Sequence, residues 1–304
     1  MNGPHQIFDT ELAVRRRERA AAGASAHQFL LDRVAEDLAE RLGIVKRDFP
    51  VGLNLGAYHG VLSRRLAGLS SVGTMIDLEA APSLLARCPG ATVLAQPELL
   101  PFGDNTLDLV VSGLALQLIN DLPGTLLQIR RALKPDGLLL AAMLGGETLT
   151  ELRQAWLAAE DEIEGGASPR VAPFADLRDV GALLQRAGFA LPVVDSDLVR
   201  VTYPTPLALM RELKAMGASN MLAARRRKPI RRETLIRASI IYQEKFGLAD
   251  GRIPATFEII TLTAWAPHES QQKPLRPGSA TARLADALGV TEMSAGERPE
   301  QEGS

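Results

Sequence analysis

The chain has 304 residues, of which 46% are hydrophobic and 23% are charged, and its formal net charge is −2 at pH 7. This length suffices for one large α/β domain, or for a domain with an inserted cap. The charge balance argues against a dedicated nucleic-acid binder, and no apolar run reaches the roughly 18 residues that a membrane helix needs. A single cysteine, Cys88, excludes a disulfide framework and a cysteine-based zinc site. The four histidines are scattered without the spacing of metal ligands, so we expect no metal.

The first 25 residues lack the apolar segment of a secretory signal peptide. Arg15–Arg17 is compatible with an organelle transit segment, but the acidic residues Asp9, Glu11 and Glu18 dilute that pattern. We therefore expect a globular protein of the reducing cytoplasm.

Two helices are expected ahead of the first strand, over residues 9–22 and 26–42. The second has apolar side chains at positions 29, 30, 31, 34, 38 and 42, which is the spacing of an amphipathic helix. Such helices either pack on a sheet or cover a ligand site.

A strand, a glycine turn and a helix follow one another over residues 51–67. Apolar residues at 51, 53 and 55 predict a short buried strand, Gly56 and Gly60 frame the turn, and residues 61–67 have helical spacing. This arrangement places free backbone N–H groups and the positive end of a helix dipole at the carboxyl edge of a sheet. It is typical of sites for small anionic or zwitterionic ligands, but it also occurs as a plain connection.

Asp77 ends the next apolar run, 72–77, and lies 21 residues after Gly56. An acid about 20 residues past a glycine turn, at the tip of the second strand, can accept hydrogen bonds from a ribose diol. The alternative is a helix N-cap or a solvated loop acid. Together the turn and the acid favour a bound nucleoside.

Three further strands continue the alternation, at 91–95, 107–112 and 138–143. The run 107–112 is almost continuously apolar, as expected of a strand buried on both faces. A helix over 123–133 ends at the breaker 134–137. This rhythm predicts a parallel, doubly wound sheet with right-handed crossovers.

The pattern changes after residue 143. Helices are expected at 149–163, 176–187, 206–216 and 231–246, and strands at 191–202 and 257–265. A helical cap, 204–253, is thus inserted between the last two strands. We predict an N-terminal helical segment (1–44), a main domain (45–289) and a polar, disordered tail (290–304).

Three motifs resemble class I S-adenosylmethionine-dependent methyltransferases: Pro101–Val110, Asn120–Pro123 and Leu133–Gly137. The resemblance implies a seven-stranded Rossmann-like sheet whose last strand is antiparallel, and S-adenosyl-L-methionine as the cofactor.

Further blocks are similar to the family of methyltransferase-like assembly factors of respiratory complex I, known as assembly factor 5. They are Ile7–Asp9, Gly145–Arg153, Gly165–Pro169, Met216–Asn220 and Trp265–Gln271. This resemblance implies modification of an arginine in a complex I subunit, by hydroxylation rather than methyl transfer. Some motifs are shared with the malonyl-carrier-protein methyltransferases of biotin synthesis.

The resemblance also implies which positions contact the cofactor. They are Asn54, Gly56, Tyr58, Gly60, Asp77, Leu78, Gln96, Leu100 and Ser112.

Several of these positions depart from the family pattern. Asn54 replaces a carboxylate, and Tyr58 replaces the middle glycine of the turn, so a side chain stands where backbone approaches the ligand. Gln96 replaces an acid that meets the adenine, and Gln117 with Leu118 replaces a His-Trp pair. The pocket is therefore expected to be altered, with Asp77 retained.

No catalytic residue can be assigned, because no nucleophile or orienting acid accompanies Tyr58 or His59. Methyl transfer depends mainly on positioning, so this does not exclude it. The leading hypothesis is a cofactor-dependent enzyme that modifies an arginine of a protein client, such as a complex I subunit. The alternatives are a non-enzymatic assembly chaperone and a methyltransferase for small molecules or carrier-bound acyl groups.

Residues 200–237 carry ten basic and two acidic side chains, including the run Arg225–Lys228. They form either an electropositive docking surface or solvated helix ends that acids elsewhere, such as Glu162 and Glu164, neutralise. The second interpretation is slightly favoured.

Overall fold

The computed structural model describes residues 6–272. The expected domain limit at residue 289 and the expected disordered tail, 290–304, lie outside the described residues. The secondary structure described below ends with the last strand, at Trp265.

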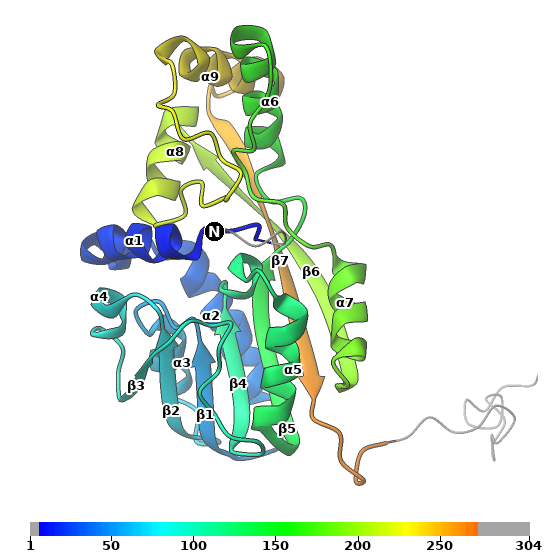
Figure 1. The fold of residues 1–304 in the computed structure, drawn as a ribbon. Helices are drawn as coiled ribbons and strands as arrows, with labels where there is room; N and C mark the ends of the chain where they lie inside the picture. The colour runs from blue at the N-terminus through cyan, green and yellow to red at the C-terminus, as the bar shows by residue number, and fades with distance from the viewer. Residues whose placement is uncertain (1–5, 273–304) are drawn as a thin grey trace, which may run out of the picture. The chain divides into compact units, whose positions relative to one another are not determined.

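One mixed sheet organises the described chain, with seven strands in the order β3-β2-β1-β4-β5-β7-β6 (Figure 1). Strands β1 to β5 pair in parallel, and β7 runs antiparallel to both β5 and β6. The predicted seven-stranded, doubly wound sheet with an antiparallel last strand is therefore confirmed. The strands are β1 (Phe49–Leu55), β2 (Val72–Glu79), β3 (Ala91–Leu94), β4 (Leu107–Gly113), β5 (Leu133–Leu144), β6 (Ala190–Tyr203) and β7 (Ile253–Trp265).

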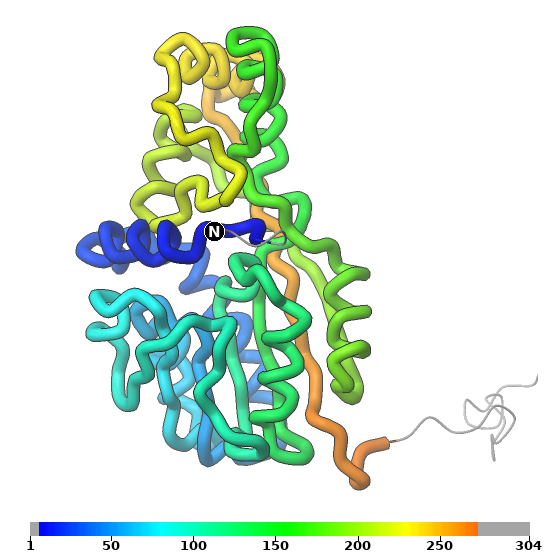
Figure 2. The backbone as a smooth tube through the Cα atoms, in the orientation of Figure 1, coloured from blue at the N-terminus to red at the C-terminus, as the bar shows by residue number. Residues whose placement is uncertain are grey.

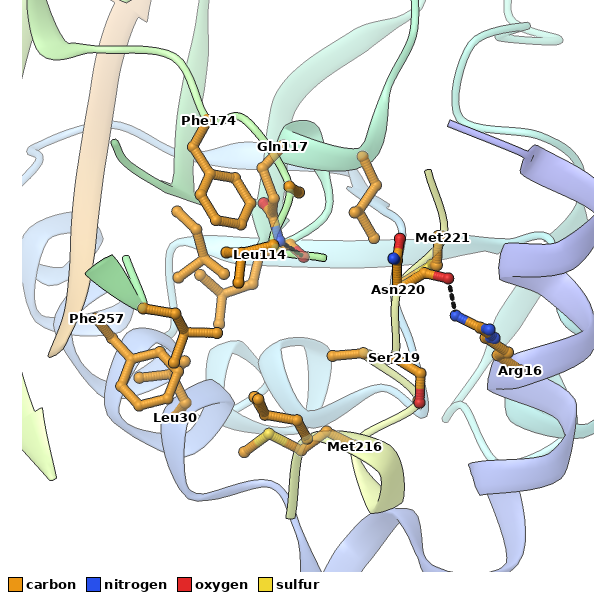
Figure 3. A pocket seen from close by; sticks show the side chains of 18 of the residues that line it. Arg16, Leu30, Leu114, Gln117, Phe174, Met216, Ser219, Asn220, Met221 and Phe257 are labelled. Atoms are coloured by element: carbon orange, nitrogen blue, oxygen red, sulfur yellow. Dashed lines mark hydrogen bonds between the residues drawn. The ribbon is translucent and has the colours of Figure 1, made fainter. Parts of the chain in front are cut away.

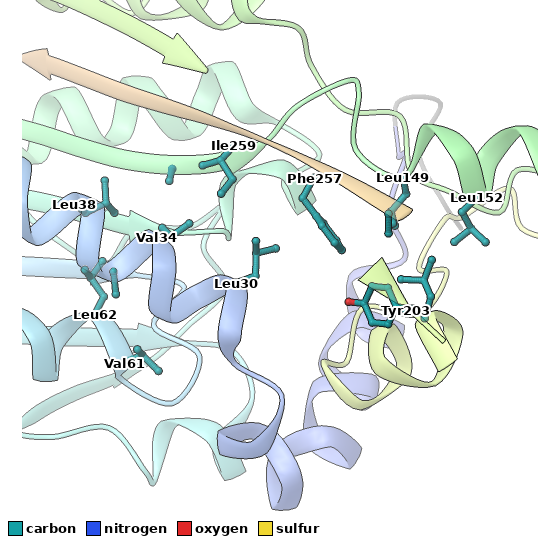
Figure 4. Close-up of a cluster of buried hydrophobic side chains, with 14 of the residues drawn as sticks. Leu30, Val34, Leu38, Val61, Leu62, Leu149, Leu152, Tyr203, Phe257 and Ile259 are labelled. Carbon is teal, nitrogen blue, oxygen red and sulfur yellow. The ribbon is translucent and has the colours of Figure 1, made fainter. Parts of the chain in front are cut away.

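Two helices cover one face of the sheet, α2 (Phe29–Gly43) and α3 (Val61–Leu66). Their side chains, including Leu38 and Leu62, form a buried cluster with alternate residues of β4 and β5 (Figure 4). Alternation arises because successive side chains of a strand point to opposite faces.

The other face is covered by α5 (Leu122–Ala132) and α7 (Leu177–Arg186). Leu126 and Leu184 lie in the second buried cluster with the intervening residues of β4 and β5. Since both faces are covered, the middle strands need apolar side chains on both sides, which explains the continuous apolar run in β4.

Two helices lie between β6 and β7 in the chain, α8 (Pro206–Ala215) and α9 (Arg232–Phe246). They confirm the helical insertion between the last two strands. α9 packs beside α6 (Thr150–Glu164), and Figure 1 shows both at the far end of β6 and β7.

The N-terminal segment crosses the carboxyl edge of the sheet. Figure 2 shows it, in blue, between the glycine-turn region and the segment that follows α8. It consists of α1 (Thr10–Ala20) and the 3₁₀ helix η1 (Ala21–Ala26), where the sequence predicts one helix over 9–22. Phe8 forms an isolated antiparallel bridge with Leu222, which ties this segment to the insertion.

Four basic side chains of residues 200–237 pair with nearby acids. Arg226 and Arg231 pair with Glu164 at 2.9 and 3.5 Å, and Arg237 pairs with Glu162 at 2.5 Å. Arg225 pairs with Asp9 at 3.0 Å. The interpretation of this run as helix ends neutralised by acids elsewhere is therefore confirmed for these side chains.

A search of the described residues finds no helix that is both long and apolar enough to cross a membrane.

Candidate functional site

The turn after β1 has the backbone shape that its glycines predict. Gly56 and Gly60 have φ values of +69° and +79°, and Tyr58 adopts the same left-handed region at +55°. A Cβ on Gly56 would lie 2.3 Å from Ala115 Cβ, so glycine is needed there for space as well as for conformation. Tyr58 lacks that freedom and holds a conformation that is uncommon for a bulky residue.

The backbone N–H groups of this turn are not free in this conformation. Ala57 N donates to Leu78 O at 2.9 Å, and Gly60 N donates to Ala57 O at 2.8 Å. Tyr58 N donates to a carboxylate oxygen of Glu79 at 2.9 Å. The expectation of free donors at this edge is therefore wrong for these three groups. Leu78 and Glu79 of β2 accept two of the hydrogen bonds, because β2 continues past Asp77, and Ala57 of the turn itself accepts the third.

Asp77 lies within β2 and not at its tip, which is a correction to the sequence prediction. Its side chain is fully buried. Oδ1 accepts hydrogen bonds from Asn54 Nδ2 at 2.8 Å and from Ser63 Oγ, whereas Oδ2 has no partner. Burial raises the pKa of this carboxyl, and the hydrogen bonds from Ser63 and Asn54 oppose the shift.

Glu79 is the acid at the end of β2, and its carboxylate is completely buried. It accepts backbone hydrogen bonds from Tyr58, Ala80 and Ala81 at 2.9 to 3.1 Å. Arg17 of α1 places Nη1 3.0 Å from both carboxylate oxygens. The Arg17 guanidinium carbon also lies 5.7 Å from the centre of the Tyr58 ring. The sequence prediction missed this cluster because Arg17 is 62 residues from Glu79.

A small cavity of about 50 Å³ lies beside Gln96, where the resemblance places the adenine. That volume suits one or two water molecules. Residues of α1, including Arg17, form one of its walls, and the others include Ala80, Ala115 and Leu118. The Gln96 amide suits a nucleoside chemically, but the cavity beside it, with α1 in this position, is too small to hold one.

Three other predicted contacts have structural roles. Leu78 is fully buried in the sheet core. Ser112 Oγ donates to Leu55 O at 2.8 Å, and Leu100 N donates to Gln128 Oε1 at 3.0 Å. The structure does not bring these three to either of the two cavities described here.

A larger cavity of about 460 Å³ adjoins the turn at Tyr58, and the sequence prediction did not identify it. Figure 3 shows Leu30, Leu114, Phe174 and Phe257 gathered at one side of it. Its walls come from segments that are distant in the chain: the N-terminal segment, the end of β4, the start of α6 and the loop after α8. A mostly apolar lining of this kind is typical of pockets that bind small ligands.

The charged side chains that line this cavity are arginines, and no aspartate or glutamate lines it among the described residues. Arg17 pairs with Glu79, and Arg170 pairs with the buried Glu160. Arg16 donates to the backbone carbonyl of Asn220, a contact drawn in Figure 3. Desolvation lowers the pKa of Arg16.

Two glutamine carbonyls in the cavity wall lack partners. Gln117 is buried and points toward the cavity, where Nε2 donates to Leu114 O at 2.7 Å and Oε1 accepts nothing (Figure 3). Gln28 donates through Nε2 to Asp32 at 2.9 Å, and its Oε1 is also unpaired. An unpaired buried acceptor costs free energy, but both oxygens are buried in this conformation and therefore assign no ligand to the cavity.

His59 of the turn is buried with its Nδ1 3.0 Å from Arg64 Nη2. Burial lowers the pKa of its imidazole, and the Arg64 charge adds to the shift. Within residues 6–272 no group of three histidine, cysteine, aspartate or glutamate side chains is placed to hold a metal ion.

The strand order, the antiparallel β7 and the glycine turn after β1 define a class I methyltransferase fold. Residues 51–141 match the family model described as a methyltransferase domain. Among solved structures, a putative methyltransferase from Bacillus halodurans aligns with a TM-score of 0.53 at 16% identity, covering 77% of this chain and 100% of that chain. The YcgJ protein of Bacillus subtilis gives a TM-score of 0.54 at 13% identity, covering 77% of this chain and 99% of that chain.

Similar curated proteins narrow the assignment. The arginine-hydroxylase NDUFAF5 of Danio rerio is 40% identical, covering 92% of this chain and 89% of that protein, and the Homo sapiens protein is 40% identical over 92% and 83%. A malonyl-[acyl-carrier protein] O-methyltransferase from Halorhodospira halophila is 36% identical over 84% and 90%. The chain belongs to the methyltransferase-like family that contains the arginine-hydroxylase NDUFAF5.

Proposed function

We propose that this chain binds S-adenosylmethionine and modifies an arginine side chain of a protein partner, such as a subunit of respiratory complex I, in the cytoplasm. The observation that carries the proposal is the 40% identity to proteins named arginine hydroxylases, over nine tenths of this chain. The 460 Å³ cavity beside the turn supports it, because it offers a mostly apolar space next to the carboxyl edge of the sheet.

The cofactor, when bound, supplies an activated methyl group and an adenosine for recognition. Gln96 lies at this edge beside the small cavity, and its amide suits the adenine amine, while Asp77 holds Asn54 and Ser63 beneath the turn that would face the cofactor. With α1 in place the space beside Gln96 is about 50 Å³, so binding requires α1 to shift.

A calorimetric titration with S-adenosylmethionine and S-adenosylhomocysteine tests the cofactor half of the proposal. We expect micromolar binding that is lost in Asp77→Ala. Asp77→Asn, which keeps the shape of the side chain, separates lost recognition from lost folding, and thermal unfolding of each variant controls for stability. No heat up to millimolar ligand would overturn this half.

A second candidate function is a non-enzymatic assembly chaperone. The specific observation in its favour is that Glu79 and Arg17 already occupy the turn, with Tyr58 N donating to Glu79. If the chain is a chaperone, it binds its client but not the cofactor. Recovery of the client in a pull-down, together with no heat in the S-adenosylmethionine titration, would support this function.

A third candidate is methylation of a carrier-bound acyl acid. The Halorhodospira relative and the arginine-lined, acid-free cavity favour it. It predicts consumption of S-adenosylmethionine with a malonyl-carrier protein, whereas the leading proposal predicts none with that substrate.

A further inference from the structure

Arg17 is held as a bound guanidinium ligand would be. Its Nη1 contacts both oxygens of Glu79 at 3.0 Å, and the guanidinium lies 5.7 Å from the Tyr58 ring centre. Its side chain is only 14% exposed. A carboxylate together with an aromatic face is the combination that recognises guanidinium groups in proteins.

The Glu79 part of this cluster is positioned without Arg17. Three backbone N–H groups, from Tyr58, Ala80 and Ala81, fix the Glu79 carboxylate. The carboxylate therefore keeps its place when Arg17 leaves, which is what a recognition site requires.

Arg17 belongs to a helix that is weakly anchored by apolar contacts. Ala20 is the one buried residue of α1, whereas α2 buries five. Polar contacts hold α1 instead, including Asp9 to Arg225 at 3.0 Å and Ser83 N to Glu18 at 2.9 Å. The Asp9–Arg225 and Arg17–Glu79 pairs are largely buried, so α1 leaves this edge readily only when another guanidinium takes the place of Arg17 on Glu79.

Charge balance favours exchange of one guanidinium for another. A cation added to the larger cavity would meet Arg16, Arg17 and Arg170 with no lining carboxylate to compensate it. When Arg17 withdraws, Glu79 becomes that carboxylate. Replacing Arg17 by an arginine of the partner leaves the local charge unchanged.

We propose that Glu79 and Tyr58 form the recognition site for the guanidinium of the substrate, and that Arg17 occupies it as an intramolecular stand-in until a partner arginine displaces α1. This inference rests on the proposed arginine-modifying function. It adds the site that binds the substrate arginine and the residue, Arg17, that blocks this site. Because the tethered Arg17 competes at high effective concentration, it lowers the apparent affinity for the partner arginine. Its departure also opens the small cavity beside Gln96.

The test measures binding of a short blocked peptide with one central arginine, without cofactor, by fluorescence anisotropy. Arg17→Ala should bind this peptide about tenfold more tightly than the unaltered chain. The gain should vanish in Arg17→Ala/Glu79→Gln, and a peptide with citrulline in place of arginine should show none.

Arg170→Ala is the matched control, since Arg170 also pairs with a buried glutamate, Glu160, and stands 5.1 Å from an aromatic ring, Trp156. An equal gain in Arg170→Ala would mean that the peptide merely fills a hole, which overturns the proposal. A folded Arg17→Ala variant without any gain would overturn it as well.

Hydrogen exchange of the unaltered chain provides a second measurement that needs no variant. Saturating arginine peptide should speed exchange over Thr10–Ala20, and unchanged protection of α1 in the bound state would contradict displacement. These assays omit the cofactor, so they test the guanidinium site separately from the enzymatic proposal. If the calorimetric titration shows no cofactor binding while Arg17→Ala still prefers the arginine peptide, the enzymatic proposal is refuted and the guanidinium site stands.

Discussion

Asp77 and Glu79 lie two residues apart on β2 and share one face of the strand, yet they have different surroundings. Asp77 lies beneath the turn with one unpaired oxygen, whereas Glu79 reaches the edge and accepts hydrogen bonds from Tyr58, Ala80, Ala81 and Arg17. The sequence spacing favours Asp77 as the acid that faces a ligand. In the structure it is Glu79 that contacts Arg17, and Arg17 lines the larger cavity.

Asp77→Asn should change how stability depends on pH. Burial raises the pKa of Asp77 in the folded chain above its value in the unfolded chain. The unfolded state then releases this proton first, so the group's stabilising contribution is present at low pH and is lost as pH rises through the folded pKa. We expect the free energy of unfolding of the unaltered chain to fall relative to that of Asp77→Asn as the pH rises above about 4, the ordinary pKa of an aspartate.

Urea unfolding of both proteins across this range is the measurement. Parallel pH profiles would contradict the buried, partly unpaired state of this carboxyl.

Tyr58→Phe should destabilise the chain by about 1 kcal/mol, because it removes the hydrogen bond from the Tyr58 hydroxyl to Met216 O at 3.0 Å. That bond joins the glycine turn to the end of α8, and the phenyl ring remains in place. Chemical denaturation measures the loss. Tyr242→Phe, which removes a bond to Pro254 O at 2.7 Å, serves as a reference for a buried tyrosine hydroxyl in the same chain. An unchanged free energy for Tyr58→Phe alongside a measurable loss for Tyr242→Phe would contradict the role of this contact.

At the scale of elements, α1 and α2 should differ in hydrogen exchange. α2 packs five buried residues against the sheet, and α1 buries one. Local opening needs less free energy where fewer apolar contacts break, so amides of Thr10–Ala20 should exchange well before those of Phe29–Gly43. Exchange of both helices at the same rate would show that α1 is an integral part of the fold.

Most elements of this fold follow from local sequence patterns. The runs 51–55, 107–112 and 138–143 are apolar and bounded by turn residues, and each lies within a strand of the structure. The order of the strands does not follow from such patterns, and the antiparallel last strand was implied only by resemblance. The end of β2 was placed two residues too early, because Leu78 and Glu79 pair with β3 and not with anything near in sequence.

At the scale of the whole molecule, the candidate site is built from segments that are far apart in the sequence. Phe8 meets Leu222 across 214 residues of chain, and Arg17 meets Glu79. Periodicity and spacing report only neighbours within an element, so neither the larger cavity nor the Arg17–Glu79 pair was predictable from them. The helical insertion was predictable as helices, but its role as a cavity wall was not.

The segment from Phe8 to Arg17 therefore connects the insertion to the glycine turn. Asp9 N donates to Met221 O at 2.8 Å, and Arg17 reaches Glu79 at the other end of the segment. A force on the insertion would therefore reach the turn through this segment, and under the proposed function a bound client would act on the site by this route.

Mass spectrometry of client proteins tests the central claim most directly. Complex I subunits would be purified from a strain that lacks this chain, from the unaltered strain, and from one that carries Glu79→Gln. We predict that one arginine of a subunit is heavier by one oxygen atom (hydroxylation) or by one CH₂ unit (methylation) in the unaltered strain, and that this added mass is absent in the other two strains. Identical arginine masses in all three strains would contradict the account.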